Sequence, residues 1–78
     1  MRPDDLLFWL RAQPFRPFRM TMNSGRTIEV RHPELVRVLR TSLVYFTPSS
    51  QADVFERAEM IGLVLIEHIE AIDATTAA

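Results

Sequence analysis

Two histidines are the only side chains in this sequence that could bind a transition metal through nitrogen, and no cysteine is present to supply sulfur. A metal site built on His32 and His68 would need a carboxylate beside them, such as Glu34 or Glu67. Their spacing matches no zinc signature. We therefore expect neither a metal nor any other cofactor. His32 is expected to cap the turn before Pro33, and His68 is expected to contact the backbone at a kink.

A general acid–base pair would have to come from the carboxylates in the second half of the chain. These are Glu56, Glu59, Glu67, Glu70 and Asp73. Nothing marks two of them as buried or facing each other, which such a pair needs in order to separate its two pKa values. The chain also has no Gly-x-Ser-x-Gly elbow, and two glycines are too few for a phosphate-binding loop. The sequence predicts solvated carboxylates, no catalytic residues and a protein that is not an enzyme.

The basic side chains are all arginine, and they are unevenly distributed. Residues 1–40 hold eight Arg and four acids, whereas residues 41–78 hold one Arg and six acids. Arginine binds phosphate and aromatic rings stack on bases, so arginines interleaved with aromatics could bind RNA or single-stranded DNA. The candidates for this function are Arg16, Arg26, Arg31, Arg37 and Arg40. The competing interpretation is an ordinary core under a charged surface, which a pI of about 6.1 favours.

The elements that would position these side chains begin with a helix, expected over residues 1–13. Asp4 and Asp5 suit its first turn, because carboxylates accept hydrogen bonds from the unpaired N–H groups there. Pro14 ends it, because the residue before a proline is driven out of the helical region. The residues that share its apolar face are Leu6, Trp9 and Leu10. A helix this short must pack on something, either the mouth of a barrel or a second subunit.

A β-hairpin is expected over residues 18–22 and 26–31, joined by a three-residue loop that ends at Gly25. Gly25 stands where a type I turn followed by a bulge needs a positive φ. This register places apolar pairs on one face and polar pairs on the other, whereas a two-residue loop would mix them. The expected pairs are Phe18 with Val30, Met20 with Ile28, Arg19 with Glu29, and Thr21 with Thr27.

Pro33 interrupts the strand pattern after this hairpin, because proline has no N–H group to donate to a ladder. The elements expected after it are a third strand over 35–39, a turn at 40–42, a fourth strand over 43–46, and a loop over 47–53 leading into one helical turn through Arg57.

The C-terminal third fits either of two structures. Residues 51–74 contain many helix formers, but Gly62 and the β-branched residues after it disfavour a helix. The apolar run from 60 to 66 suits a strand that is buried on both faces. The preferred prediction is a strand over 59–66, a kink at 67–68, a short strand over 69–72 and a frayed tail over 74–78. One long helix is the alternative.

The chain length of 78 residues predicts one domain, 1–78, with its β core over 18–73. A core of this size contributes only about 3–5 kcal/mol of net stability. Because 47% of the residues are hydrophobic, we expect apolar surface that a second copy or another protein covers. The interface candidates are Leu6, Trp9, Leu10, Leu39, Ile61, Leu63 and Leu65. No membrane-spanning segment is expected, and the absence of cysteine suits the cytoplasm.

Two motifs and the end of the chain carry a resemblance. Pro14-Phe15-Arg16-Pro17-Phe18 is followed by Gly25-Arg26-Thr27, by Val30-Arg31-His32-Pro33-Glu34 and by Leu65-Ile66-Glu67-His68-Ile69-Glu70. This pattern resembles a family of short uncharacterised bacterial proteins. The order of a short helix, strands and a kinked final strand is also similar to small SH3-like and Sm-like barrels. That likeness implies an antiparallel barrel of about five strands, assembly into rings by strand pairing, and RNA binding.

Overall fold

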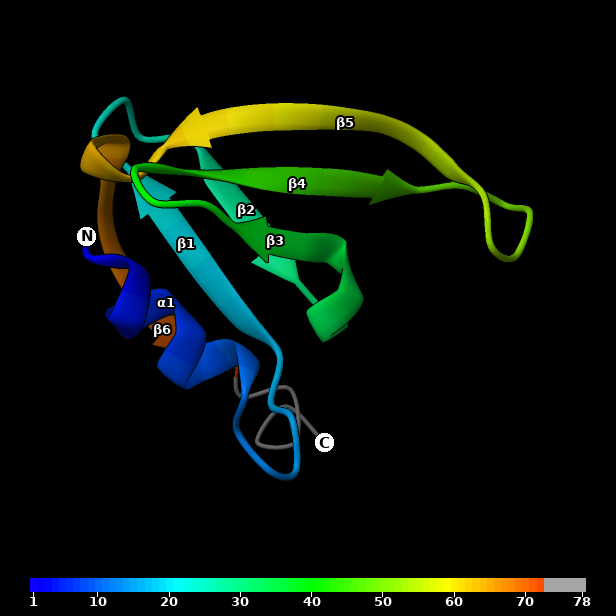
Figure 1. The fold of residues 1–78 in the computed structure, drawn as a ribbon, viewed down its shortest axis with the longest axis horizontal. Helices are drawn as coiled ribbons and strands as arrows, with labels where there is room; N and C mark the ends of the chain where they lie inside the picture. Colours follow the sequence, from blue (N-terminus) through cyan, green and yellow to red (C-terminus); the bar gives the residue numbers. More distant parts are fainter. Residues whose placement is uncertain (73–78) are drawn as a thin grey trace.

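The computed structural model describes residues 1–72, which form a mainly β fold with one short N-terminal helix (Figure 1). Its strands make two three-stranded antiparallel sheets, ordered β2-β1-β6 and β3-β4-β5. The elements are α1 (Pro3–Leu10), β1 (Phe18–Met22), β2 (Thr27–Val30), η1 (Pro33–Leu35), β3 (Val36–Val38), β4 (Ser42–Pro48), β5 (Phe55–Gly62), η2 (Leu63–Leu65) and β6 (Ile66–Ala71). The predicted mainly β class with a short N-terminal helix is therefore confirmed, whereas residues 1–72 contain six strands rather than about five and their two sheets are not closed into a barrel.

Helix α1 begins and ends close to its predicted bounds. The Asp5 carboxylate accepts a hydrogen bond from the backbone N–H of Arg2 at 3.2 Å, so this acid stabilises the first turn as expected. The helix ends at Leu10 rather than at residue 13. It buries Leu6 completely, and Trp9 packs against the core beside it.

The hairpin of β1 and β2 has the predicted register, because only that register sends every apolar side chain inward. The four pairs are Phe18 with Val30, Arg19 with Glu29, Met20 with Ile28, and Thr21 with Thr27. Gly25 has a φ of +94° and donates its N–H to the carbonyl oxygen of Met22 at 2.8 Å. The turn therefore depends on a residue that tolerates a left-handed backbone.

We expect Gly25→Val to lower the free energy of unfolding by about 1–2 kcal/mol, because a β-branched residue resists positive φ. A Cβ at this position would meet no atom within 4 Å, so the loss would be conformational and not steric. Urea unfolding followed by circular dichroism measures it. Ser24→Val in the same exposed turn is the matched control, and equal stability of the two variants would contradict the explanation.

The third strand is shorter than the predicted 35–39. Leu35 belongs to η1, where its N–H donates to the carbonyl oxygen of His32 at 3.1 Å. Leu39 lies in the following turn and donates to the carbonyl oxygen of Ser42 at 2.7 Å. Within β3 the alternation is as predicted, since Val36 is buried and Arg37 is exposed.

The helical turn predicted through Arg57 is wrong, because the chain is already in β5 at that point. β5 pairs with β4 along nearly its whole length, with Thr47 opposite Arg57 and Ser42 opposite Gly62. The turn between the strands includes Asp53, which has a φ of 68°. Figure 1 shows this hairpin as a long ribbon whose turn projects beyond the rest of the fold. Pairing with β4 outweighs the local helical propensity of residues 51–57.

The break in the C-terminal third comes earlier than predicted, at Leu63–Leu65 and not at residues 67–68. The single strand predicted over 59–66 and the long helix are therefore both wrong. Tertiary hydrogen bonds hold the break in place: Leu63 donates its N–H to Thr41 at 3.0 Å, and Asn23 donates its N–H to Leu65 at 2.8 Å. The final strand, β6, then pairs with β1. Asp73 and the tail predicted over 74–78 lie outside the described residues.

A single cluster of apolar side chains joins α1 and both sheets. Its buried members are Leu6, Phe18, Met20, Met22, Ile28, Val30, Leu35, Val36, Leu43, Ile61, Leu63 and Ile66. Within residues 1–72 no polar or charged residue is buried. The fold is thus held by apolar packing, and every charged side chain in the described part is left at the surface.

Candidate functional site

The main candidate site is the surface around β5, where most of the exposed large apolar side chains gather. Seven such residues are exposed within residues 1–72, and five of them fall between positions 54 and 65. These five are Val54, Phe55, Met60, Val64 and Leu65. Val64 is 78% exposed and Met60 is 68% exposed, so neither is shielded by its own chain. Several exposed apolar side chains along one element are typical of an interface.

The two faces of the β4–β5 ribbon differ in chemistry. On one face, Met60 lies opposite Val44 and Ala58 lies opposite Phe46, and the ring of Phe46 stacks on that of Phe55 at 5.0 Å between centroids. On the other face, Ile61 enters the core beside Leu43, while Glu59 and Arg57 continue outward along the strand. The ribbon therefore presents an apolar face, a charged face and one free edge.

Glu59 is the one carboxylate on β5 that is held firmly by its own chain. Both of its oxygens accept hydrogen bonds from the guanidinium of Arg26, at 2.5 and 2.8 Å. This hydrogen bonding lowers the pKa of Glu59 below its usual range and raises the pKa of Arg26. The pair ties the β1–β2 turn to β5 and fixes the direction of the Glu59 side chain.

A second carboxylate is paired on β2. Glu29 accepts hydrogen bonds from Arg19 at 3.2 Å and from Arg31 at 2.8 Å, and these bonds lower the pKa of Glu29. Arg19 also bonds to Glu70 at 3.3 Å, which links β6 to the same network. Arg19 thus pairs with a carboxylate on each neighbouring strand of this sheet. Arg19 and Glu29 lie opposite each other, as predicted.

We expect the melting temperature to fall on acidification below about pH 4.5, the usual pKa of glutamate. The folded-state pKa values of Glu29 and Glu59 are lowered, so their stabilisation is complete above the unfolded value and is lost as the pH falls through the folded values. The effect should be small, because both groups are exposed. Arg26→Gln should flatten the acid limb of a thermal-melt profile; an unchanged profile would contradict a role for this ion pair.

The structure divides the predicted interface residues into three groups. Leu6, Ile61 and Leu63 are core residues with at most 4% exposure, so a single copy already covers them. Trp9 and Leu10 are half-buried and pack against the core. Leu39 and Leu65 are 44% and 48% exposed and remain open to a partner. Five more exposed apolar residues lie outside that set: Phe8, Val54 and Phe55, which were missed, and Met60 and Val64, which lie in the apolar run 60–66.

The exposure of β5 does have a signal in the sequence. Residues 56–59 read Glu-Arg-Ala-Glu, which has no apolar position to bury on either face of a strand. That pattern is typical of a ribbon or edge strand exposed on both sides, whereas the prediction was a helical turn through Arg57 followed by a buried strand from residue 59.

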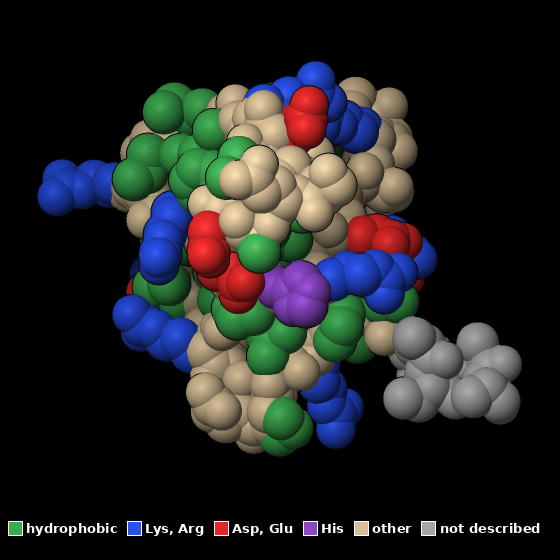
Figure 2. Space-filling model, turned by 90° about the vertical axis from the view of Figure 1, so that its right-hand side faces the viewer, with side chains coloured by type: hydrophobic (Ala, Val, Ile, Leu, Met, Phe, Trp, Pro, Cys, Tyr) green, Lys and Arg blue, Asp and Glu red, His purple; other side chains and the backbone are tan. Residues whose placement is uncertain are grey.

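The five arginines proposed for nucleic-acid binding are not gathered into one free basic surface. Arg26 and Arg31 are paired with Glu59 and Glu29. Arg16, Arg37 and Arg40 are exposed, and no carboxylate within residues 1–72 pairs with them. Figure 2 shows acidic and basic side chains interspersed with apolar ones on the face that it presents. Electrostatic attraction to phosphates is weakened where the signs alternate.

The histidine side chains do not make the contacts that were predicted for them. His32 precedes η1, but its side chain makes no capping hydrogen bond. His68 lies in β6, and its Nε2 is 3.3 Å from a carboxylate oxygen of Glu70 rather than against backbone at a kink. In the described part of the chain, no three His, Asp or Glu side chains come together as a metal site.

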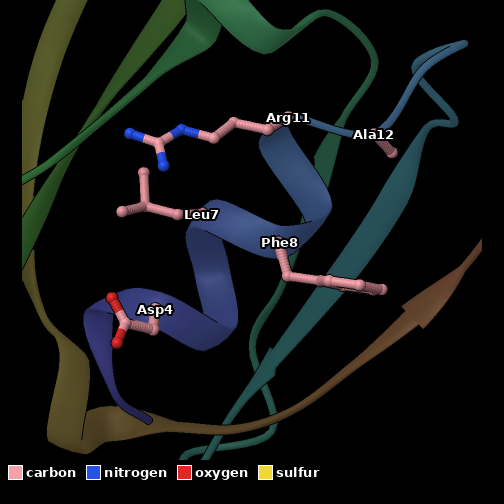
Figure 3. Close-up of a pocket in the computed structure, with 5 residues that line it drawn as sticks. All are labelled: Asp4, Leu7, Phe8, Arg11 and Ala12. Atoms are coloured by element: carbon pink, nitrogen blue, oxygen red, sulfur yellow. The ribbon is translucent and has the colours of Figure 1, made fainter.

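Helix α1 carries an open depression on its surface. Its lining consists of Asp4, Leu7, Phe8, Arg11 and Ala12. Figure 3 shows Asp4, Leu7 and Arg11 extending from one side of the helix and Phe8 from another. One acid and one arginine on an open helix surface enclose no substrate, so this depression resembles contact surface more than a catalytic pocket.

No protein-family model, curated protein or solved structure matches this chain. Among residues 1–72 no helix is long and apolar enough to cross a membrane.

Proposed function

We propose that this chain is a non-enzymatic interaction module that associates with copies of itself through the surface around β5. The observation that carries this proposal is how little of β5 is buried: Ile61 is the only buried residue among its eight. A strand that buries so few side chains and pairs along only one edge gains little stability from that pairing. Phe55 and Met60 would lose water contact on association, which favours binding.

A small SH3-like or Sm-like barrel topology is the fold that we propose for such a module. The connections support it: β2 leads into β3 through η1, and β5 leads into β6 through η2. The chain therefore passes between its two sheets at two 3₁₀ helices. The absence of cysteine from the sequence supports a cytoplasmic setting.

Sedimentation equilibrium of the full chain, from low micromolar to several hundred micromolar, tests the proposal. We expect a reversible monomer–oligomer equilibrium in this range and no binding of labelled single-stranded RNA or DNA at low salt. A monomer at every concentration would overturn self-association. Oligonucleotide binding that is lost steeply on adding salt would favour instead the arginine-based function, with Arg16, Arg37 and Arg40 as the first residues to mutate.

A further inference from the structure

β5 is the edge strand of its sheet, and its outer edge carries no partner in the described chain. In Figure 1 it runs along the top of the fold with no other element beyond it. An edge of this kind presents unpaired N–H and C=O groups that can pair with another strand.

The hydrogen-bonding pattern identifies which residues offer those groups. Leu63 donates its N–H to Thr41, which continues the β4–β5 register one step beyond Ser42 and Gly62. Bonded and non-bonded pairs alternate along an antiparallel ladder. The residues that bond to β4 are therefore Ile61, Glu59 and Arg57, and those that face the free edge are Gly62, Met60 and Ala58.

We propose that β5 pairs antiparallel with β5 of a second copy, about a two-fold axis at Ala58. This inference rests on the proposed self-association and specifies its surface. Ala58 would exchange both backbone hydrogen bonds with Ala58 of the other copy, at the centre of the regular part of the strand that faces the free edge. The β3-β4-β5 sheets of the two copies would then join into one six-stranded sheet, so that β5 would no longer be an edge strand in either copy.

Charge favours this register over its two nearest alternatives. With Ala58 opposite Ala58, Arg57 lies directly opposite Glu59 of the other copy, and the symmetry makes this ion pair twice. Two residues can exchange backbone hydrogen bonds across the interface only if both face the free edge. The nearest alternative registers therefore move the two-fold axis by one residue, to Arg57 or to Glu59. Those registers place Arg57 opposite Arg57 or Glu59 opposite Glu59, and like charges directly opposite each other are destabilising.

The local geometry suits this arrangement. Arg57 is exposed and its side chain has no partner within residues 1–72. Glu59 is oriented by Arg26, and a carboxylate still has lone pairs for another guanidinium. Ala58 is small, so two copies can approach at the centre without a clash. The ladder shifts register between Thr47 and Pro48, which places the irregularity at Glu56 on β5 and leaves a regular strand from Arg57 to Gly62.

Complementary charge variants test the register. Arg57→Glu and Glu59→Arg should each weaken self-association at least about tenfold, because either variant would place like charges opposite each other at two positions of the dimer. An equimolar mixture of the two variants should restore association to near the wild-type level, since every pair is then opposite in charge. Arg40→Glu, an equal change of charge away from β5, is the control and should leave association unchanged.

The outcomes separate the two proposals. A monomeric wild type would overturn both the function and the register. A self-associating wild type that neither charge variant weakens, or single variants that their mixture fails to rescue, would overturn the β5 register alone. Assembly into a closed ring larger than a dimer would also overturn it, because a two-fold pairing of β5 closes at two copies.

Proline at Ala58 provides a test that does not disturb Arg26 and Glu59. The N–H of Ala58 faces the free edge, so Ala58→Pro removes no bond to β4 but removes the central bonds of the interface. Ala58→Thr keeps this N–H and is the matched control. We expect the proline variant to dissociate at least about tenfold more readily than the threonine variant, with both folded by circular dichroism. Equal association of two folded variants would overturn the pairing.

Discussion

Replacing Phe18 with alanine is expected to cost about 3–5 kcal/mol and to leave most of the protein unfolded. Phe18 is completely buried in β1, the central strand of its sheet, with Val30 on one side and Ala71 on the other. Its ring lies 5.6 Å from that of Trp9, measured between centroids, which joins the sheet to α1. A cavity here would remove the packing contacts through which this ring joins β1 to β2, β6 and α1.

Urea unfolding monitored by tryptophan fluorescence measures this loss. Phe8→Ala is the matched control, because the same atoms are removed from a side chain that is 75% exposed. It should change the free energy of unfolding by less than about 0.5 kcal/mol. A Phe18→Ala variant as stable as the Phe8→Ala variant would show that the core does not depend on this ring.

The first hairpin could be predicted to the level of individual residue pairs, for a physical reason. Its strands have one buried and one solvated face, so a slip of one residue would reverse every side chain. Gly25 independently fixes the loop length. Two local constraints that agree leave a single register, and the structure has it.

The region from 55 to 66 could not be predicted in the same way, because its conformation depends on distant residues. The apolar run that suggested one buried strand contains Leu63, which is buried, and Val64, which is 78% exposed. The 3₁₀ turn that contains both residues is held by backbone groups of Thr41 and Asn23. No local property of the run indicates that these two residues will lie beside it.

The presence of an exposed apolar surface could be predicted from the sequence, but only some of the residues that form it could be. Length and composition indicate more apolar side chain than one small core can cover, and exposed apolar residues are indeed present. Which of them stay exposed depends on the position of the strand break. Moving the break from residues 67–68 to Leu63–Leu65 places Ile61 in the core and leaves Met60 outside.

Ile61→Asp and Met60→Asp should therefore differ greatly, although the two residues are adjacent in β5. Ile61 is 4% exposed and lies opposite Leu43 in the core, so a carboxylate there would be buried without a partner. We expect a loss above about 4 kcal/mol, and hence an unfolded chain by circular dichroism. Met60 is 68% exposed, and an aspartate there should cost less than about 1 kcal/mol, mainly through its low strand propensity.

The Met60→Asp variant then separates folding from association. Its carboxylate would leave the core untouched and would remove apolar surface from the free edge of β5. We therefore expect a folded protein whose self-association in sedimentation equilibrium is weaker than that of the wild type. A folded Met60→Asp variant that associates as the wild type does would place the interface elsewhere. If both aspartate variants folded equally well, β5 would have to lie in a register other than the one in which Ile61 faces Leu43.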